Sequence, residues 1–148
     1  MAGTFSNLTV HVVFSTKDRL PLMTTPVRDQ LFPYMGGVVR GIAGTIISVG
    51  GMPDHVHLVV RLPTSLSVAD VVRTVKTNTS KWMNGRAVGM KFGWQRGYGA
   101  FSVSQSALPA VVNYVRNQER HHRCRSFKEE LTVLLTKNGI DFDERYLC

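Results

Sequence analysis

The sequence predicts an α+β fold with the succession β-α-β-β-α-β, in which an antiparallel sheet carries its helices on one face. Two observations predict it. Runs of β-branched and aromatic residues, typical of strands, alternate with segments whose apolar residues recur every three or four positions, as on one face of a helix. The order of these segments is that of the ferredoxin-like split βαβ arrangement, which is also RRM-like.

The first strand and the first helix lie within residues 8–41. Residues 8–16 are β-branched and aromatic, and a polar turn follows them. Thr25 stands where a helix cap is expected, and Pro26 takes the first helical position, where its missing N–H costs nothing. Apolar residues then keep helical spacing up to Gly41.

Two further strands come next. Residues 45–49 are mostly β-branched and end at two glycines, and residues 55–62 form another β-rich run that stops at Pro63. A short turn at residues 52–54 leads from the first of these runs into the second.

The second half of the chain predicts one more strand and three helices. Ser67 caps a helix with valines on one face. Residues 91–104 are rich in glycine and aromatic residues, which indicates a fourth strand with a bulge or turn at residues 97–99. A C-terminal helix that begins at Ser106 and a further short helix over about residues 127–137 complete the prediction.

Length, composition and charge restrict the class of protein. A chain of 148 residues, 43% of them apolar, suits one domain over residues 1–148. The net charge of +8 favours a polyanionic partner, and residues 61–125 hold eleven Lys and Arg against two acidic residues. The two cysteines form no disulfide framework, and no signal peptide or membrane span is evident. We therefore expect a cytoplasmic protein with no membrane partner.

The most informative short motif is His55-Val56-His57, inside the third predicted strand. Side chains alternate along a strand, so both imidazoles project from one face and Val56 from the other. Two imidazoles about 7 Å apart can bind one divalent metal ion. The alternative is a pair of polar residues on a solvated sheet face. With helices on one face only, the motif is expected on the open face, where a ligand can reach it.

Tyr114 and Gln118 are four residues apart in the helix after the last strand, so they share one side of it. A tyrosine oxygen can attack phosphorus, but its pKa of about 10 requires help from a cation or a base. A helical tyrosine is more often a core or rim residue. The basic surroundings, which include Arg116 and Arg120, favour a role toward phosphate.

Taken together, these motifs resemble the single-tyrosine HUH transposases of single-strand-DNA insertion sequences. The joint pattern is far more specific than any of its parts, and it covers nearly the whole chain in the family's order. The segments that carry it are residues 51–60 (GMPDHVHLVV), 94–104 (WQRGYGAFSVS) and 114–118 (YVRNQ), with residues 121–140 and 143–147 in the tail.

The resemblance implies a role for each matching residue. Tyr114 would be the nucleophile that cleaves single-stranded DNA, giving a 5′-phosphotyrosine intermediate and a free 3′-hydroxyl before strand transfer. His55, His57 and Gln118 would bind a divalent metal, Mg²⁺ or Mn²⁺, and no nucleotide cofactor is expected because no phosphate-binding loop motif occurs. The resemblance also implies DNA with hairpin ends as the partner, a homodimer with shared active sites, and nucleoid association when the protein is bound to DNA.

Several basic residues are candidates for DNA contacts because they flank strand or helix ends or lie in the basic tyrosine helix. A further basic stretch begins at His121-His122, which we interpret as a helix end near phosphate rather than a zinc site, since adjacent helical residues point about 100° apart. The candidate DNA contacts are Lys17, Arg19, Lys76, Arg96, Arg116 and Arg120.

Two alternative functions stay open. Residues 96–101 (RGYGAF) resemble the start of the RNP1 motif, so a non-catalytic RRM-like RNA-binding module would fit the element order. RNP1 normally falls on the third strand, whereas this copy falls on the fourth, and that module leaves Tyr114 and the histidine motif unexplained. The second alternative is a domesticated protein that binds DNA hairpins without transposing them.

Overall fold

The computed structural model describes residues 3–86, 91–122 and 126–143, and its centre is a four-stranded antiparallel sheet in the order β2-β3-β1-β4. This order is the one expected for the β-α-β-β-α-β succession, and it places β1 and β3 side by side in the middle of the sheet. The strands are β1 (Thr9–Ser15), β2 (Thr45–Met52), β3 (His55–Arg61) and β4 (Gly99–Ser102).

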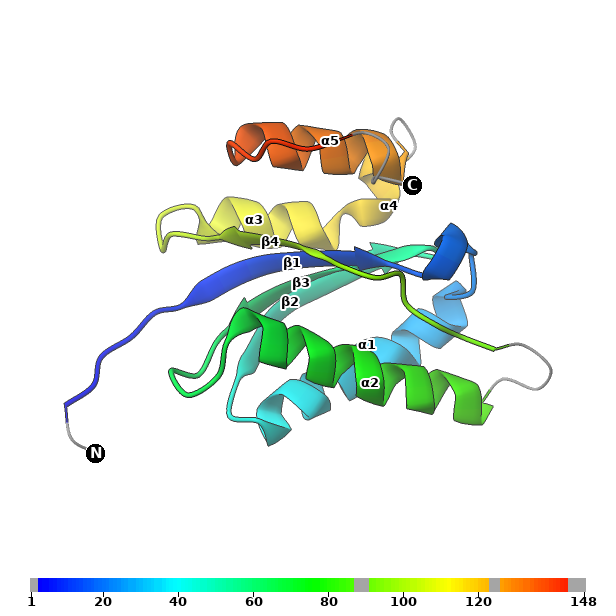
Figure 1. Ribbon diagram of the computed structural model, residues 1–148, viewed down its shortest axis with the longest axis horizontal. Coiled ribbons are helices and arrows are strands. Elements are labelled where there is room, and N and C mark those ends of the chain that lie inside the picture. Colours follow the sequence, from blue (N-terminus) through cyan, green and yellow to red (C-terminus); the bar gives the residue numbers. More distant parts are fainter. Residues whose placement is uncertain (1–2, 87–90, 123–125, 144–148) are drawn as a thin grey trace.

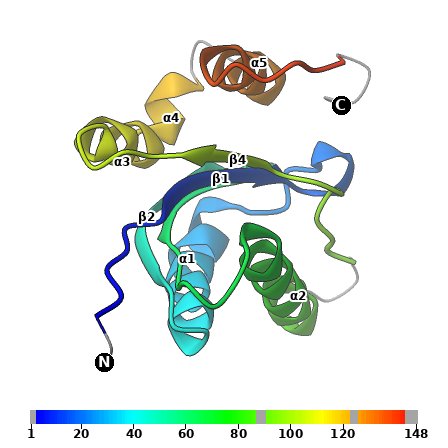
Figure 2. The ribbon, with the colours of Figure 1, turned by 60° about the vertical axis from the view of Figure 1, so that its left-hand side comes forward.

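Helices cover both faces of the sheet (Figures 1 and 2). On one face lie α1 (Thr25–Gly41) and α2 (Val68–Arg86). On the other face lie α3 (Leu108–Arg116), the short α4 (Gln118–His121) and α5 (Phe127–Lys137). A 3-10 turn, η1 (Lys17–Arg19), follows β1. In the described part of the chain, no helix combines the length and apolarity that a membrane span needs.

The predicted sheet has α1 and α2 on one face, as expected, but the expectation that the other face is open and exposes the histidine motif is wrong. The reason is a second apolar cluster. Val13 and Phe101 project from the sheet toward α5 and are buried there by Phe127 and Leu135. These apolar side chains are removed from water only when α5 folds back over β1 and β4.

The main core lies between the sheet and the pair α1 and α2. Val12, Phe14, Val56 and Leu58 point into it from the two central strands and meet Leu31 and other buried side chains of α1 and α2. Because neighbours along a strand point to opposite faces, His11, His55 and His57 project to the α3–α5 side. The alternation predicted for the His55-Val56-His57 motif is thus observed.

Local signals set most of the element ends. Ser67 and Asp70 cap the start of α2 reciprocally, since each side chain accepts a hydrogen bond from the other's backbone N–H. The fourth strand begins at Gly99, just after Gly97, whose φ of +82° turns the chain there. The tyrosine helix begins at Leu108, two residues later than expected, and it stops at Asn117, so α3 and α4 are separate helices.

Candidate active site

His55 and His57 lie at the centre of the sheet beneath α4 and α5, and both side chains are fully buried. In each ring the Nδ1 atom makes a hydrogen bond with a residue of the sheet or of the turn between β2 and β3. His55 Nδ1 lies 2.8 Å from Asp54 Oδ1, and His57 Nδ1 lies 2.8 Å from Nε2 of His11 on β1. These contacts fix the ring planes and direct the two Nε2 atoms toward the helices, as second-sphere partners do for histidine ligands.

The structure brings Tyr114 and Gln118 to this pair of histidines. Gln118, the first residue of α4, has its Oε1 3.2 Å from His55 Nε2. Tyr114, on α3, stands edge-on to His57 with 5.8 Å between the ring centroids. The four residues expected to act together are therefore neighbours within one chain.

A carboxylate that was not predicted, Glu130 on α5, lies among them. Its Oε1 is 2.8 Å from His57 Nε2, 3.2 Å from His122 Nε2 and 3.4 Å from His55 Nε2. Its other oxygen accepts a hydrogen bond from the Tyr114 hydroxyl. Glu130 is 1% exposed, so its negative charge depends on these partners rather than on water.

His122 lies at a helix end, as expected, but its side chain joins the histidine cluster. His122 follows α4, and its Nε2 lies 3.1 Å from Gln118 Oε1 as well as close to Glu130. The bend at Asn117 separates α3 from α4, and it carries the chain toward the histidine pair. Residues 123–125 of the same basic stretch lie outside the described residues.

The charges in this cluster are set by burial and by hydrogen bonds. Burial alone would raise the pKa of Glu130, but hydrogen bonds from His122, His55 and His57 outweigh it and hold the pKa well below the usual carboxyl range. Burial opposes the charged form of His55, yet its hydrogen bonds to Asp54 and Glu130 prevail and raise its pKa. Burial lowers the pKa of His57. A carboxylate anion therefore lies against one imidazole that favours its charged form and one that favours its neutral form.

His11 completes the cluster from the sheet side. Burial, with a smaller contribution from the neighbouring His57, lowers its pKa from 6.5 to about 3. A neutral His11 can form one hydrogen bond with His57 across their 2.8 Å contact. In this bond one ring nitrogen donates and the other accepts. His11 is thus a buried sheet residue whose hydrogen-bond partner is the candidate ligand His57.

The donor atoms at this site suit a divalent cation. Ligand atoms of His55, His122 and Glu130 all lie within 4.8 Å of one another, close enough to converge on a single ion. Gln118 Oε1 lies beside the two histidines of that group. A mixed set of imidazole nitrogens and amide or carboxylate oxygens is acceptable to Mn²⁺ and related divalent ions. The residues therefore fit a metal.

Glycine at position 50 lets the tyrosine helix approach the sheet. A Cβ atom on Gly50 of β2 would lie 1.9 Å from the backbone oxygen of Val115, so any side chain there would displace α3. Val115 is fully buried at this contact, and its neighbour Tyr114 is held over β3. The close packing of β2 against α3 thereby positions the tyrosine.

The basic residues expected to contact DNA lie in separate places. Arg116 and Arg120 line a hollow of about 340 Å³ beside Gln118. Lys76 and Arg96 line another of about 430 Å³ on the far side of the sheet, against α2. Lys17 and Arg19 belong to η1. The two hollows thus hold different pairs of these residues.

The comparisons with known proteins bear on this geometry. A family model described as IS200-like transposase matches residues 4–118, which include β1 to β4, Tyr114 and Gln118. The chain belongs to this family. It is a transposase of the HUH type, and the matched range contains the paired histidines of β3 and Tyr114 of α3. Glu130 and His122 lie beyond the matched range.

Solved structures show that the transposase shares its fold with other chains. A candidate transposase from Deinococcus radiodurans R1 is 22% identical, with a TM-score of 0.64 over 80% of this chain and 95% of that one. A REP-associated tyrosine transposase, solved bound to a REP hairpin, is 16% identical, with a TM-score of 0.58 over 78% of this chain and 70% of that one. Comparison with curated proteins gave no match.

Proposed function

We propose that this transposase cleaves and rejoins single-stranded DNA with Tyr114 as the nucleophile. One observation carries the proposal most strongly: the Tyr114 hydroxyl, the paired histidines and Gln118 meet around a single buried carboxylate, Glu130. A transposase needs a nucleophile beside groups that offset the negative charge of a reacting phosphate. An RNA-binding module has no use for such a cluster.

The covalent step uses this arrangement directly. The Tyr114 oxygen attacks the phosphorus of the scissile phosphodiester, loses its proton and forms a 5′-phosphotyrosine bond. The bond from phosphorus to the 3′ oxygen breaks, and that oxygen leaves as a 3′-hydroxyl after taking up a proton. Attack by the 3′-hydroxyl of another end reverses these changes and joins the strands. The number of phosphodiester bonds is conserved, so no nucleotide hydrolysis is needed.

We also propose the residues that hold the divalent metal. His55, His57 and Gln118, the set implied by the family resemblance, would be joined by His122 and Glu130, because the structure gathers all five donor side chains. A bound Mg²⁺ or Mn²⁺ would act as a Lewis acid toward the phosphate oxygens. Glu130 would in addition position the Tyr114 hydroxyl through their hydrogen bond.

The reaction partner we propose is single-stranded DNA with hairpin ends, and the setting is the cytoplasm, on the nucleoid when DNA is bound. The hairpin is supported by the ligand of the REP-associated relative. The homodimer with shared sites stays a prediction. Within this chain Tyr114 lies beside the chain's own histidines, which favours a site built by one chain.

Formation of a protein–DNA adduct tests the nucleophile. We expect the protein, incubated with Mn²⁺ and single-stranded DNA from the genomic ends that flank its gene, to form an adduct that survives denaturation and maps to Tyr114. Tyr114→Phe should form none while binding DNA with nearly unchanged affinity. Tyr34→Phe, a tyrosine stacked on Trp82 away from the site, is the matched control and should react normally. An adduct with Tyr114→Phe would refute the assignment.

Direct measurement of metal binding tests the ligand set independently of activity. Glu130→Gln removes a charged ligand but keeps the shape, and we expect at least about tenfold weaker Mn²⁺ binding by calorimetry or electron paramagnetic resonance. Glu129→Gln changes the exposed neighbour on the same helix and should leave Mn²⁺ affinity unchanged. Equal affinities of the Glu130→Gln and wild-type proteins would remove Glu130 from the set.

A further inference from the structure

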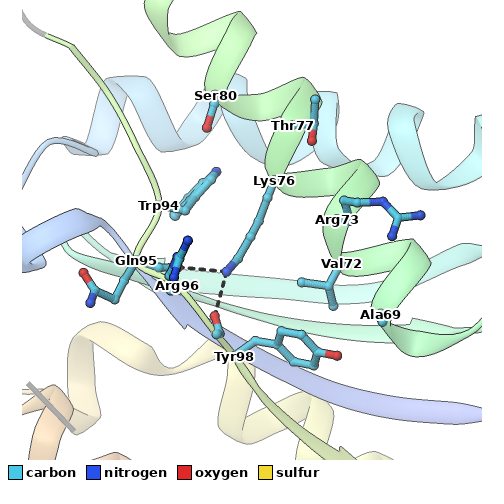
Figure 3. Close-up of a pocket in the computed structure, with 11 residues that line it drawn as sticks. Ala69, Val72, Arg73, Lys76, Thr77, Ser80, Trp94, Gln95, Arg96 and Tyr98 are labelled. Carbon is cyan, nitrogen blue, oxygen red and sulfur yellow. Dashed lines mark hydrogen bonds between the residues drawn. The ribbon is translucent and has the colours of Figure 1, made fainter. Parts of the chain in front are cut away.

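A cavity of about 430 Å³ lies between α2 and the segment that leads into β4, on the face of the sheet opposite the histidine cluster (Figure 3). Its walls combine basic, hydroxyl and aromatic groups. Arg73, Thr77 and Ser80 come from α2, while Trp94, Arg96 and Tyr98 come from the segment before β4. Neither the metal site nor the covalent step uses any of them.

Tyr98 offers an open aromatic face at this cavity. The residue is 43% exposed, although it follows a segment that is held firmly to α2. The Lys76 ammonium donates hydrogen bonds to the backbone oxygens of Gln95, at 2.9 Å, and Gly97, at 2.6 Å. The ammonium also lies 5.9 Å from the centroid of the Tyr98 ring. The ring is therefore presented on a fixed backbone, which reduces the entropy lost when a planar group stacks on it.

Positive charge surrounds this ring. Arg96 is exposed beside it, and Arg73 projects from α2 with its side chain 70% exposed, although it also pairs with Asp70 at 2.7 Å. The Thr77 and Ser80 hydroxyls line the same hollow and can donate or accept hydrogen bonds. These groups suit an unpaired nucleotide. An aromatic face stacks on the base, guanidinium groups contact the phosphate, and hydroxyls form hydrogen bonds with the base edge.

The RNP1-like hexamer at residues 96–101 forms part of this cavity wall. Its first aromatic residue, Tyr98, borders the cavity, whereas the second, Phe101, is 5% exposed and packs beneath α5. An RRM uses its aromatic residues to stack two or three bases. Of the two aromatic rings in this hexamer, Tyr98 is the exposed one, so the hexamer offers a stacking surface for a single base.

The same segment connects the two sides of the molecule. Residues 95–98 line this cavity and also a hollow of about 270 Å³ that faces Phe127 and Leu131 of α5. Since β4 is an edge strand, a nucleic acid strand can pass around this edge without crossing the core. One nucleotide held at Tyr98 would thus tether a strand whose continuation lies on the side of the Tyr114 site.

We propose that this cavity binds one unpaired nucleotide of single-stranded DNA, with Tyr98 stacking on the base and Arg73 and Arg96 contacting its phosphates. The proposal rests on the function proposed above, because it assigns a place to the substrate of that reaction. It names a site that is separate from the Tyr114 centre, so each can fail without the other.

Fluorescence anisotropy with a labelled single-stranded oligonucleotide tests the site. Tyr98→Leu keeps an apolar side chain but removes the aromatic face, and we expect binding roughly five- to hundredfold weaker. Tyr98→Phe should bind nearly as well as the wild type. Arg73→Ala should weaken binding, whereas Lys81→Ala, an exposed cation of the same helix outside the cavity, should have a smaller effect. Unchanged affinity of Tyr98→Leu, with an unchanged melting temperature, would overturn the proposal.

A base-specific probe separates this site from the catalytic proposal. A 2-aminopurine placed at successive positions of the oligonucleotide should be quenched at one position in the wild type, and the quenching should disappear in Tyr98→Leu. An adduct formed normally by a protein that shows no such position would retain the transposase mechanism and refute the pocket. Quenching without any adduct would retain the pocket and refute the transposase mechanism. Tighter binding of the matching RNA than of the DNA would also contradict the proposal.

Discussion

Glu130 joins parts of the chain that are far apart in the sequence. Its carboxylate contacts His57 on β3, His122 after α4 and Tyr114 on α3, and it belongs to α5 itself. A buried carboxylate without partners would be very unfavourable, so these contacts are needed for α5 to dock as it does. The group that would bind the metal therefore also organises the helices around it.

The neutral state of His11 makes a prediction about stability and pH. Its pKa is about 3 in the folded protein and 6.5 for the free side chain, so the unfolded chain takes up the proton first as the pH falls. The free energy of unfolding should therefore decrease by about 2 kcal/mol between pH 6.5 and pH 5. Urea titrations in the presence of a chelator measure this decrease.

The groups that face His11 do not reverse the sign of this effect. His57 also has a lowered pKa and adds to the loss. His55 has a raised pKa, so its contribution is complete below pH 6.5 and stays constant over this range. Glu130 begins to take up protons in the unfolded state only nearer pH 4.5. His11→Gln should reduce the dependence on pH, and a variant with the full wild-type decrease would contradict the prediction.

The site residues differ in how far sequence could predict them. His55 and His57 need only a strand assignment, because alternation then puts them on one face, and Tyr114 and Gln118 need only a helix. Glu130 follows Glu129 in the first turn of α5, where acidic residues are common for the helix dipole alone. The sequence feature that could have singled out Glu130 is its position three residues after Phe127, which places it on the apolar side of the helix.

The contact between α3 and β2 gives a prediction at the level of these elements. Gly50→Ala would place a methyl group against the Val115 carbonyl and push α3 outward. We expect a loss of at least about 2 kcal/mol in unfolding free energy, and adduct formation should fall because Tyr114 moves with the helix. Chemical denaturation and the adduct assay measure the two effects.

Gly37→Ala is the matched control for this change. Gly37 is exposed on α1, and the nearest atom to an added methyl is the Arg40 side chain at 3.7 Å, an ordinary contact. The substitution should raise the unfolding free energy by about 0.5–1 kcal/mol because alanine favours the helix. If Gly50→Ala behaved like Gly37→Ala, α3 would not be held as described.

The strands and helices themselves were largely predictable, and their arrangement on the second face was not. Propensity and periodicity located α1 and α5 at the residues observed. The covered second face depends on contacts between β4 and α5, such as that of Phe101 with Phe127, which are distant in sequence and leave no local pattern. The fold class could be derived from the chain, but the enclosure of the histidines could not.

For the whole molecule, mixing two inactive variants tests whether one chain or two build the active site. Tyr114 and His57 of the same chain are neighbours here, so a mixture of Tyr114→Phe and His57→Ala proteins should form no adduct. Electrophoresis under denaturing conditions measures this. Restored adduct would instead show that α3 exchanges between subunits, as the predicted shared site requires.

The β2–β3 hairpin restricts insertions and deletions in this part of the protein during evolution. Met52 pairs with His55 and Gly50 with His57, and only Pro53 and Asp54 turn the chain between the strands. Inserting or deleting one residue in β3 between the turn and His57 would rotate that histidine into the apolar core and bring a neighbouring valine or leucine to the α3–α5 side. Substitutions in this hairpin can accumulate over time, but a change in its length would remove half of the ligand pair in a single step.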